Sequence, residues 1–135
     1  MATVVTAAHS SLSEKDDRAL LALFRAYTVT ATLWLLLATG VGILMAFKFG
    51  APEFGSGAWP TFERLRPIHT NATFYGFASV ALVGFAYYVV ARSSGAKLYS
   101  ATLAWTGLLL FNVAAAAGTL ALDLGYNAGD LEYRE

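Results

Sequence analysis

Three long segments of this chain contain no ionised side chain, and they constrain its fold more than any other feature. Residues 26–47, 68–91 and 98–122 each run past about 20 residues, the length that an α-helix needs to cross the hydrocarbon core of a bilayer. A single short segment can satisfy its backbone polar groups inside a bilayer only as a helix. The sequence therefore predicts an all-α integral membrane protein with three transmembrane helices, at about residues 26–47, 67–91 and 98–122.

The segments around these runs are short or polar. Residues 1–25 are predicted to form a leader and an amphipathic lead-in, and residues 123–135 an acidic tail outside the membrane. Residues 48–66 contain glycines and prolines that break regular structure and indicate a loop. The connection over residues 91–97 is so short that the second and third helices should be antiparallel neighbours.

The composition excludes several other classes of protein. The formal net charge is zero and no basic tract is long enough to suggest a nucleic-acid partner. There is no cysteine, which excludes disulfides, thiolate metal sites and covalent attachment of a haem. Acidic residues near the N-terminus do not suit a cleaved signal peptide, so the first helix is expected to be retained.

The positive charges predict how the helices are oriented. Five of them fall on one side of the predicted spans, namely Lys15, Arg18, Arg25, Arg92 and Lys97. Four fall on the other side, namely Lys48, Arg64, Arg66 and Arg134. Because cytoplasmic loops carry an excess of lysine and arginine, this distribution favours a cytoplasmic N-terminus.

One histidine lies at the start of the second apolar run, in the sequence Arg64-Leu-Arg-Pro-Ile-His-Thr-Asn71. Pro67 suits the first position of a helix, where its missing N–H costs nothing, and this would place His69 in the first turn. A single imidazole at the edge of a membrane span suits axial ligation of a haem. Arg64 and Arg66 would lie just outside the span, where guanidinium groups pair well with the carboxylates of haem propionates. The simpler alternative is a histidine facing lipid headgroups, beside arginines that reach lipid phosphate.

The helix face that carries His69 continues through small or short side chains. At about 3.6 residues per turn, they are Ala72, Thr73, Gly76, Val80, Val83 and Gly84. Such a face would leave room for the edge of a flat porphyrin. It would equally allow close packing against another membrane helix, so both interpretations stay open.

The acidic tail carries oxygen ligands of the kind that calcium prefers. They belong to Asp123, Asn127, Asp130, Glu132 and Glu135. A calcium-binding loop starting at Asp123 would have Ala128 at its sixth position and Arg134 at its twelfth, where such loops need glycine and glutamate. The tail is therefore predicted to be a solvated cap, with one carboxylate contributed to a shared metal site as the alternative.

Residues 64–71 resemble the start of the second helix in the catalytic subunit, subunit I, of cbb-type cytochrome c oxidases, which form the C-family of the haem–copper oxidase superfamily. The resemblance extends to three further stretches: Trp59-Pro-Thr-Phe-Glu63, Phe85-Ala-Tyr-Tyr-Val-Val90 and Leu131-Glu-Tyr-Arg-Glu135. Nitric oxide reductases share the His-Thr-Asn portion, whereas the preceding Leu-Arg-Pro is closer to the oxidases.

This resemblance implies roles for particular residues. His69 would be one of two axial ligands of the low-spin haem b. Arg66 would lie among the haem propionates, with Arg64 as a weaker candidate. Glu132 would help to bind a calcium ion near the propionates, with Tyr133 beside it.

The resemblance also implies a fold and partners. The chain would supply the first three helices of a twelve-helix bundle in a bacterial inner (plasma) membrane, as the N-terminal piece of the subunit, either encoded separately or cut short, with truncation slightly favoured. The second haem b ligand, the second haem and the copper site would lie on later helices. The expected partners are therefore the rest of that subunit, c-type cytochrome subunits and the lipid bilayer.

The implied function is the reduction of oxygen to water with proton translocation. This chain alone lacks the oxygen-reducing centre, since His9 and His69 are its only histidines. Two alternatives remain: a fragment of the large subunit of a nitric oxide reductase, and a small membrane scaffold without a cofactor.

Overall fold

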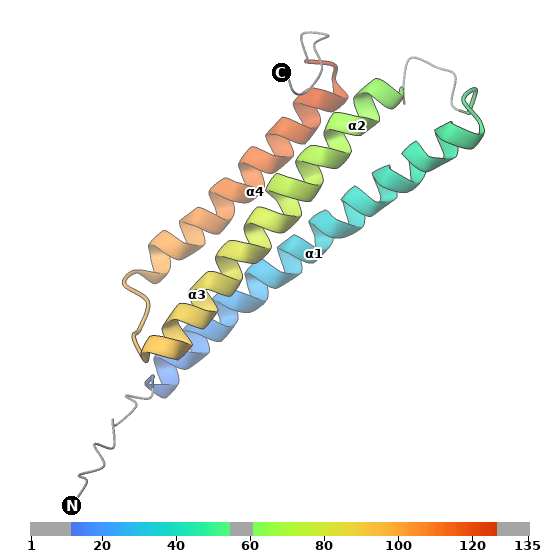
Figure 1. The fold of residues 1–135 in the computed structure, drawn as a ribbon. Helices are drawn as coiled ribbons and strands as arrows, with labels where there is room; N and C mark the ends of the chain where they lie inside the picture. Colours follow the sequence, from blue (N-terminus) through green and yellow to red (C-terminus); the bar gives the residue numbers. More distant parts are fainter. Residues whose placement is uncertain (1–11, 55–60, 127–135) are drawn as a thin grey trace, which may run out of the picture.

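The computed structural model describes residues 12–54 and 61–126, which form three long helical rods (Figure 1). Helix α1 spans Glu14–Gly50. The second rod consists of helix α2 (Phe62–Asn71), the π-helix η1 (Ala72–Ser79) and helix α3 (Val80–Ser94). Helix α4 spans Ala101–Asp123. All three rods are long and apolar enough to cross a membrane, which confirms the prediction of an all-α membrane architecture.

The second rod lies between α1 and α4, and consecutive rods run antiparallel (Figure 1). Helix α1 packs along the whole second rod, whereas α4 packs mainly on α2 and η1. The N-terminal end of α1 and the C-terminal end of α3 therefore lie at one end of the bundle. The start of α2 and the end of α4 lie at the other.

Helix α1 begins before the apolar run and continues through it without a break. Ser13 caps its first turn, where the Ser13 hydroxyl oxygen accepts a hydrogen bond from the backbone N–H of Asp16 at 3.2 Å. Acidic residues in that turn also stabilise the helix, because their negative charges lie at the positive end of its dipole. The amphipathic lead-in and the first span are thus one continuous helix.

The predicted start of the second helix at Pro67 is wrong, because α2 begins at Phe62. Thr61 supplies the cap, and its side chain accepts from the backbone N–H of Arg64 at 3.3 Å. Pro67 therefore lies inside the helix, where it cannot donate to the carbonyl of Glu63. His69 lies about two turns into α2 instead of in its first turn.

The connection between the second and third rods is a short loop with defined ends. Helix α3 ends at Ser94 and is capped by Gly95, whose φ of 66° is the left-handed conformation that glycine adopts without strain. Helix α4 begins after Ser100, whose side chain accepts from the backbone N–H of Leu103 at 3.2 Å. This loop turns the chain back on itself, as its length predicted.

The small residues of the second rod are used for packing against α1. A Cβ added to Gly76 would lie 2.6 Å from Cγ of Trp34, and one added to Gly84 would lie 2.9 Å from Cγ of Tyr27. The bulky side chains of α1 therefore sit directly over these two glycines. Of the two interpretations of this face, close helix packing is the arrangement that the structure has at Gly76 and Gly84.

Polar side chains inside the bundle join the rods at separate levels. The hydroxyl of Tyr27 donates to the carbonyl oxygen of Ala104 at 3.0 Å. The indole N–H of Trp34 donates to the side-chain oxygen of Asn112 at 2.9 Å. Both bonds tie α1 to α4 across the second rod, and each satisfies a polar group that would otherwise be costly to bury in hydrocarbon.

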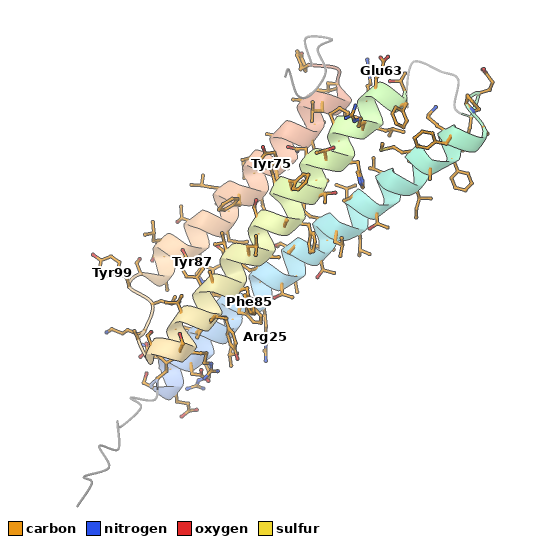
Figure 2. The ribbon with its side chains drawn as sticks, in the orientation of Figure 1. Arg25, Glu63, Tyr75, Phe85, Tyr87 and Tyr99 are labelled. Atoms are coloured by element: carbon orange, nitrogen blue, oxygen red, sulfur yellow. The ribbon has the colours of Figure 1, made fainter. Side chains whose placement is uncertain are left out.

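The outside of the bundle is apolar along most of its length. Tyr75 and Phe85 project from the second rod and are 62% and 58% exposed, while Arg25 and Glu63 lie toward opposite ends of the bundle (Figure 2). Large exposed hydrophobic side chains of this kind would face water in a soluble protein. Their number and their position between the charged ends fit a surface in contact with lipid.

Candidate functional site

The imidazole of His69 lies half-buried between α2 and α1. Its Nδ1 atom is 2.8 Å from the backbone carbonyl oxygen of Ala38. A carbonyl oxygen can only accept a hydrogen bond, so Nδ1 carries a proton, and in the neutral ring Nε2 then holds the lone pair. Within the described ranges, no polar atom is a hydrogen-bond partner of Nε2. His69 is therefore held in the tautomer that can bind a metal through Nε2.

The backbone changes geometry three residues after His69. The hydroxyl of Thr73 donates to the carbonyl oxygen of His69 at 2.7 Å, and the π-helix η1 begins at Ala72. A π-helix has a wider turn than an α-helix, and such segments are frequent at functional sites. This wider turn shifts the register of the residues that follow, which a period of about 3.6 residues does not anticipate.

The two arginines predicted to contact propionates lie in different surroundings. Arg66 is exposed and precedes His69 by three residues, so both share one side of α2 about one turn apart. Arg64 is half-buried on another side, where its Nη1 atom donates to the carbonyl oxygen of Asp123 at 3.1 Å. Arg66 is thus the arginine that lies near His69, whereas Arg64 joins α2 to the end of α4.

Asn71 is a residue of the same motif whose role the sequence analysis missed. Its side-chain amide donates to the carbonyl oxygen of Ala115 at 3.2 Å and to the hydroxyl of Thr119 at 2.8 Å. Both partners are on α4. The signal that could have revealed this role is a carboxamide in an otherwise apolar segment, since such side chains commonly hydrogen-bond across membrane helices.

His69 and Asn71 together place the second rod between its neighbours. The imidazole contacts α1, and the carboxamide, two residues later, contacts α4. Gly118 gives Asn71 space, because a Cβ at that position would lie 3.3 Å from the Asn71 amide nitrogen. The orientation of the imidazole is therefore tied to the positions of all three rods.

An apolar cavity of about 690 Å³ lies between α1, α2 and α4 near this site. Leu65 and Ile68 of α2 line it together with Val41 and Leu44 of α1 and Thr119 of α4. His69 is not among its lining residues. The cavity therefore shares walls with the site but does not contain the imidazole.

Several predicted site residues cannot be placed. His9, Glu132, Tyr133 and Arg134 lie outside the described residues, as do most of the acidic residues of the tail. Within the part of the chain that the structure describes, no group of three or more His, Cys, Asp or Glu side chains could hold a metal ion. The calcium role of Glu132 therefore stays a prediction.

The opposite end of the bundle is joined by an ion pair. Nη2 of Arg92 lies 2.7 Å from Oδ1 of Asp17, and the Arg92 guanidinium lies over the ring of Tyr88 at 5.4 Å from its centroid. Tyr88 also stacks on Phe24, with their ring centroids 4.6 Å apart. This cluster fastens the start of α1 to the end of α3, far from His69.

Comparison with known proteins gives a consistent result. Residues 22–135 match the model of the family described as Cytochrome C and Quinol oxidase polypeptide I. A cytochrome c oxidase subunit 1 of Rhodobacter capsulatus is 40% identical over 86 residues, which cover 60% of this chain and 16% of that protein. No solved structure matches the chain.

Two further relatives match a larger part of the chain. A cytochrome c oxidase subunit 1 homolog of Agrobacterium tumefaciens (strain T37) is 35% identical over 113 residues, or 81% of this chain and 20% of the relative. The Cbb3-type cytochrome c oxidase subunit CcoN1 of Stutzerimonas stutzeri is 31% identical over 116 residues, or 82% of this chain and 23% of the relative. The chain thus spans 16 to 23% of the length of these three relatives.

Proposed function

The chain belongs to the family of cytochrome c and quinol oxidase polypeptide I, and on this premise we propose that it forms the first three helices of the catalytic subunit of a cbb-type haem–copper oxidase. The resemblance found in residues 64–71 is confirmed at the level of the family. The proposed role of this part of the subunit is to supply one axial ligand of the low-spin haem b. The observation that carries this proposal is the 2.8 Å contact between Nδ1 of His69 and the carbonyl oxygen of Ala38.

The donor set of the chain fits a haem. The Nδ1–H of His69 is engaged by the carbonyl of Ala38, which leaves the Nε2 lone pair available as a ligand. Haem b, when bound, would pass single electrons by cycling its iron between two oxidation states. His69 would be the residue of this chain that binds the iron, and Gly42 and Ala38 of α1 lie next to its ring.

The charged residues of the same end would neutralise the propionates. Arg66 is exposed on the His69 side of α2, so its guanidinium is free to form a bidentate pair with a carboxylate. Arg64 already donates to the end of α4 and would contribute less directly. Glu132 is proposed to add a calcium ion to this end, where negative charges at low dielectric would otherwise be costly.

The complete reaction needs segments that this chain does not supply. His9 and His69 are the only histidines of the sequence, so the second haem b ligand, the second haem and the copper site are assigned to the rest of the subunit. The proposed partners are that remainder and c-type cytochrome subunits in a bacterial inner membrane, with the N-terminus cytoplasmic. The proposed overall activity is the reduction of oxygen to water coupled to proton translocation.

The test uses the purified oxidase that contains this chain. The His69→Ala variant should lose the low-spin haem b absorption bands, whereas the His9→Ala variant should keep them and serves as the matched control. A His69→Gly variant with added imidazole should regain part of the bands, which separates loss of the ligand from misfolding. An unchanged haem b spectrum in His69→Ala would refute the assignment, and turnover with nitric oxide but not with oxygen would replace the oxidase by a nitric oxide reductase.

A further inference from the structure

The ring of His69 lies against a glycine of α1. A Cβ added to Gly42 would lie 3.0 Å from Cε1 of His69, 3.3 Å from Nδ1 and 3.9 Å from Nε2. All three of the nearest heavy atoms therefore belong to one imidazole. By contrast, a Cβ added to Gly40 or Gly50 of the same helix would have no such neighbour within 4 Å. Gly42 is thus the described glycine of α1 whose missing side chain makes room for His69.

Helix geometry explains why this position matters for the hydrogen bond. In an α-helix the N–H of residue 42 points to the carbonyl oxygen of residue 38, so the two positions are stacked one turn apart. The Ala38 oxygen is the atom that accepts from Nδ1 of His69 at 2.8 Å. A side chain on residue 42 would stand beside this oxygen and obstruct the approach of an imidazole.

We infer that Gly42 is a positioning residue for His69. Its missing side chain lets the imidazole reach the Ala38 carbonyl, and that bond sets both the tautomer of the ring and its rotation. Donation from Nδ1–H also makes Nε2 a stronger electron donor, because hydrogen bonds to a ligating histidine raise its basicity. Gly42 would therefore tune the haem through His69, an inference that rests on the proposed function.

The expected effect follows from the distances. Carbon atoms prefer separations of about 3.5–4.0 Å, so a methyl group at residue 42 would push the ring away by a few tenths of an ångström or more. The 2.8 Å bond to Ala38 would lengthen and weaken. With a weaker hydrogen bond at Nδ1, Nε2 donates less electron density and stabilises oxidised iron less. The reduction potential of haem b should therefore rise, and the haem should dissociate more readily.

The experiment compares three variants in the complete, haem-loaded oxidase: Gly42→Ala, Gly42→Val and, as the matched control, Gly40→Ala. The measurements are the midpoint potential of haem b, the electron paramagnetic resonance g values of its ferric form and the rate of haem loss in detergent. Gly42→Ala should raise the potential, change the g values and weaken haem retention by up to about 10–100-fold, the range for complete loss of such a hydrogen-bond partner. Gly42→Val should do more, and Gly40→Ala should match the unmodified protein.

The outcomes separate this inference from the proposed function. If His69→Ala keeps haem b, the ligand assignment fails and the role of Gly42 fails with it. If His69→Ala loses haem b but Gly42→Ala keeps the potential, g values and haem retention of Gly40→Ala, the positioning role alone is overturned. Should Gly42→Val fail to assemble, the smaller Gly42→Ala variant decides the question by the same criteria.

Discussion

Replacing Gly76 by alanine should destabilise the bundle because the added carbon has no space. It would lie 2.6 Å from Cγ and 2.7 Å from Cε3 of Trp34, against a preferred separation of about 3.5–4.0 Å. The second rod and α1 would have to separate by roughly 1 Å to remove this overlap. That displacement also strains the 2.9 Å hydrogen bond from the Trp34 indole to Asn112 on α4.

The size of the effect can be estimated from three contributions. Overpacking a close contact typically costs about 1–3 kcal/mol. Weakening the Trp34–Asn112 bond adds up to about 0.5–1.5 kcal/mol. Alanine is favoured over glycine in a helix by about 1 kcal/mol, which offsets part of the loss. Because Gly40→Ala has the same offset but meets no atom within 4 Å, Gly76→Ala should be less stable than Gly40→Ala by about 1–4 kcal/mol.

The measurement is the free energy of unfolding of the purified oxidase in mixed micelles, followed by the loss of helical signal as a denaturing detergent is added. A double variant tests the cause. Trp34→Ala removes the three atoms nearest to the new carbon, so adding Gly76→Ala to Trp34→Ala should cost little or nothing. The reasoning is refuted if Gly76→Ala unfolds like Gly40→Ala, or if its cost is the same with and without Trp34.

Two further changes test the end of the bundle near His69, the proposed haem ligand. Asn71→Leu removes two hydrogen bonds to α4 while keeping the side-chain volume similar, so it should lower the free energy of unfolding by about 1–3 kcal/mol, measured in the same detergent titration with Thr119→Val as the one-bond comparison. An unchanged free energy of unfolding would mean that these hydrogen bonds stabilise the bundle no more than bonds from Asn71 to water or lipid would. Arg66→Gln removes a positive charge from the His69 side of α2, which should lower the midpoint potential of haem b because the reduced haem carries one more negative charge. A potential equal to that of the unmodified oxidase would place Arg66 away from the propionates.

The three rods could be predicted because hydrocarbon leaves a helix so few alternatives, and the absence of charge over a sufficient length is visible in the sequence. The residue at which the second rod starts could not be predicted. Pro67 is a strong signal for the first turn of a helix, but Thr61 is an earlier cap, whose side chain accepts from the backbone N–H of Arg64, and the acidic Glu63 follows it in the first turn. Thr61 and Pro67 are both valid signals for a helix start, and the sequence does not show which one is used. The structure shows why the earlier one is used, because Leu65 and Ile68 pack against α1.

The identity of His69 as the candidate ligand followed from the sequence, but its orientation did not. The atom that orients it is a backbone carbonyl, and every residue has one, so Ala38 carries no distinguishing sequence signal. The same holds for the small residues of the second rod. Gly76 and Gly84 indicate that something packs closely there, but only the register between rods shows that Trp34 and Tyr27 do so.

Helix α1 therefore helps to position the candidate ligand His69 as well as being long and apolar enough to span a membrane. Its contact with Gly76 is at Trp34, and the carbonyl that holds the imidazole is at Ala38, four residues or about 6 Å farther along the same helix. A continuous α-helix is stiff over one turn, so a displacement forced at Trp34 should reach Ala38 almost undiminished. Gly76→Ala should then loosen the Ala38–His69 bond along with the bundle, and haem b should be lost at lower denaturant than the helical signal. If both signals were lost together, α1 would be yielding locally at Trp34 and the two contacts would be independent.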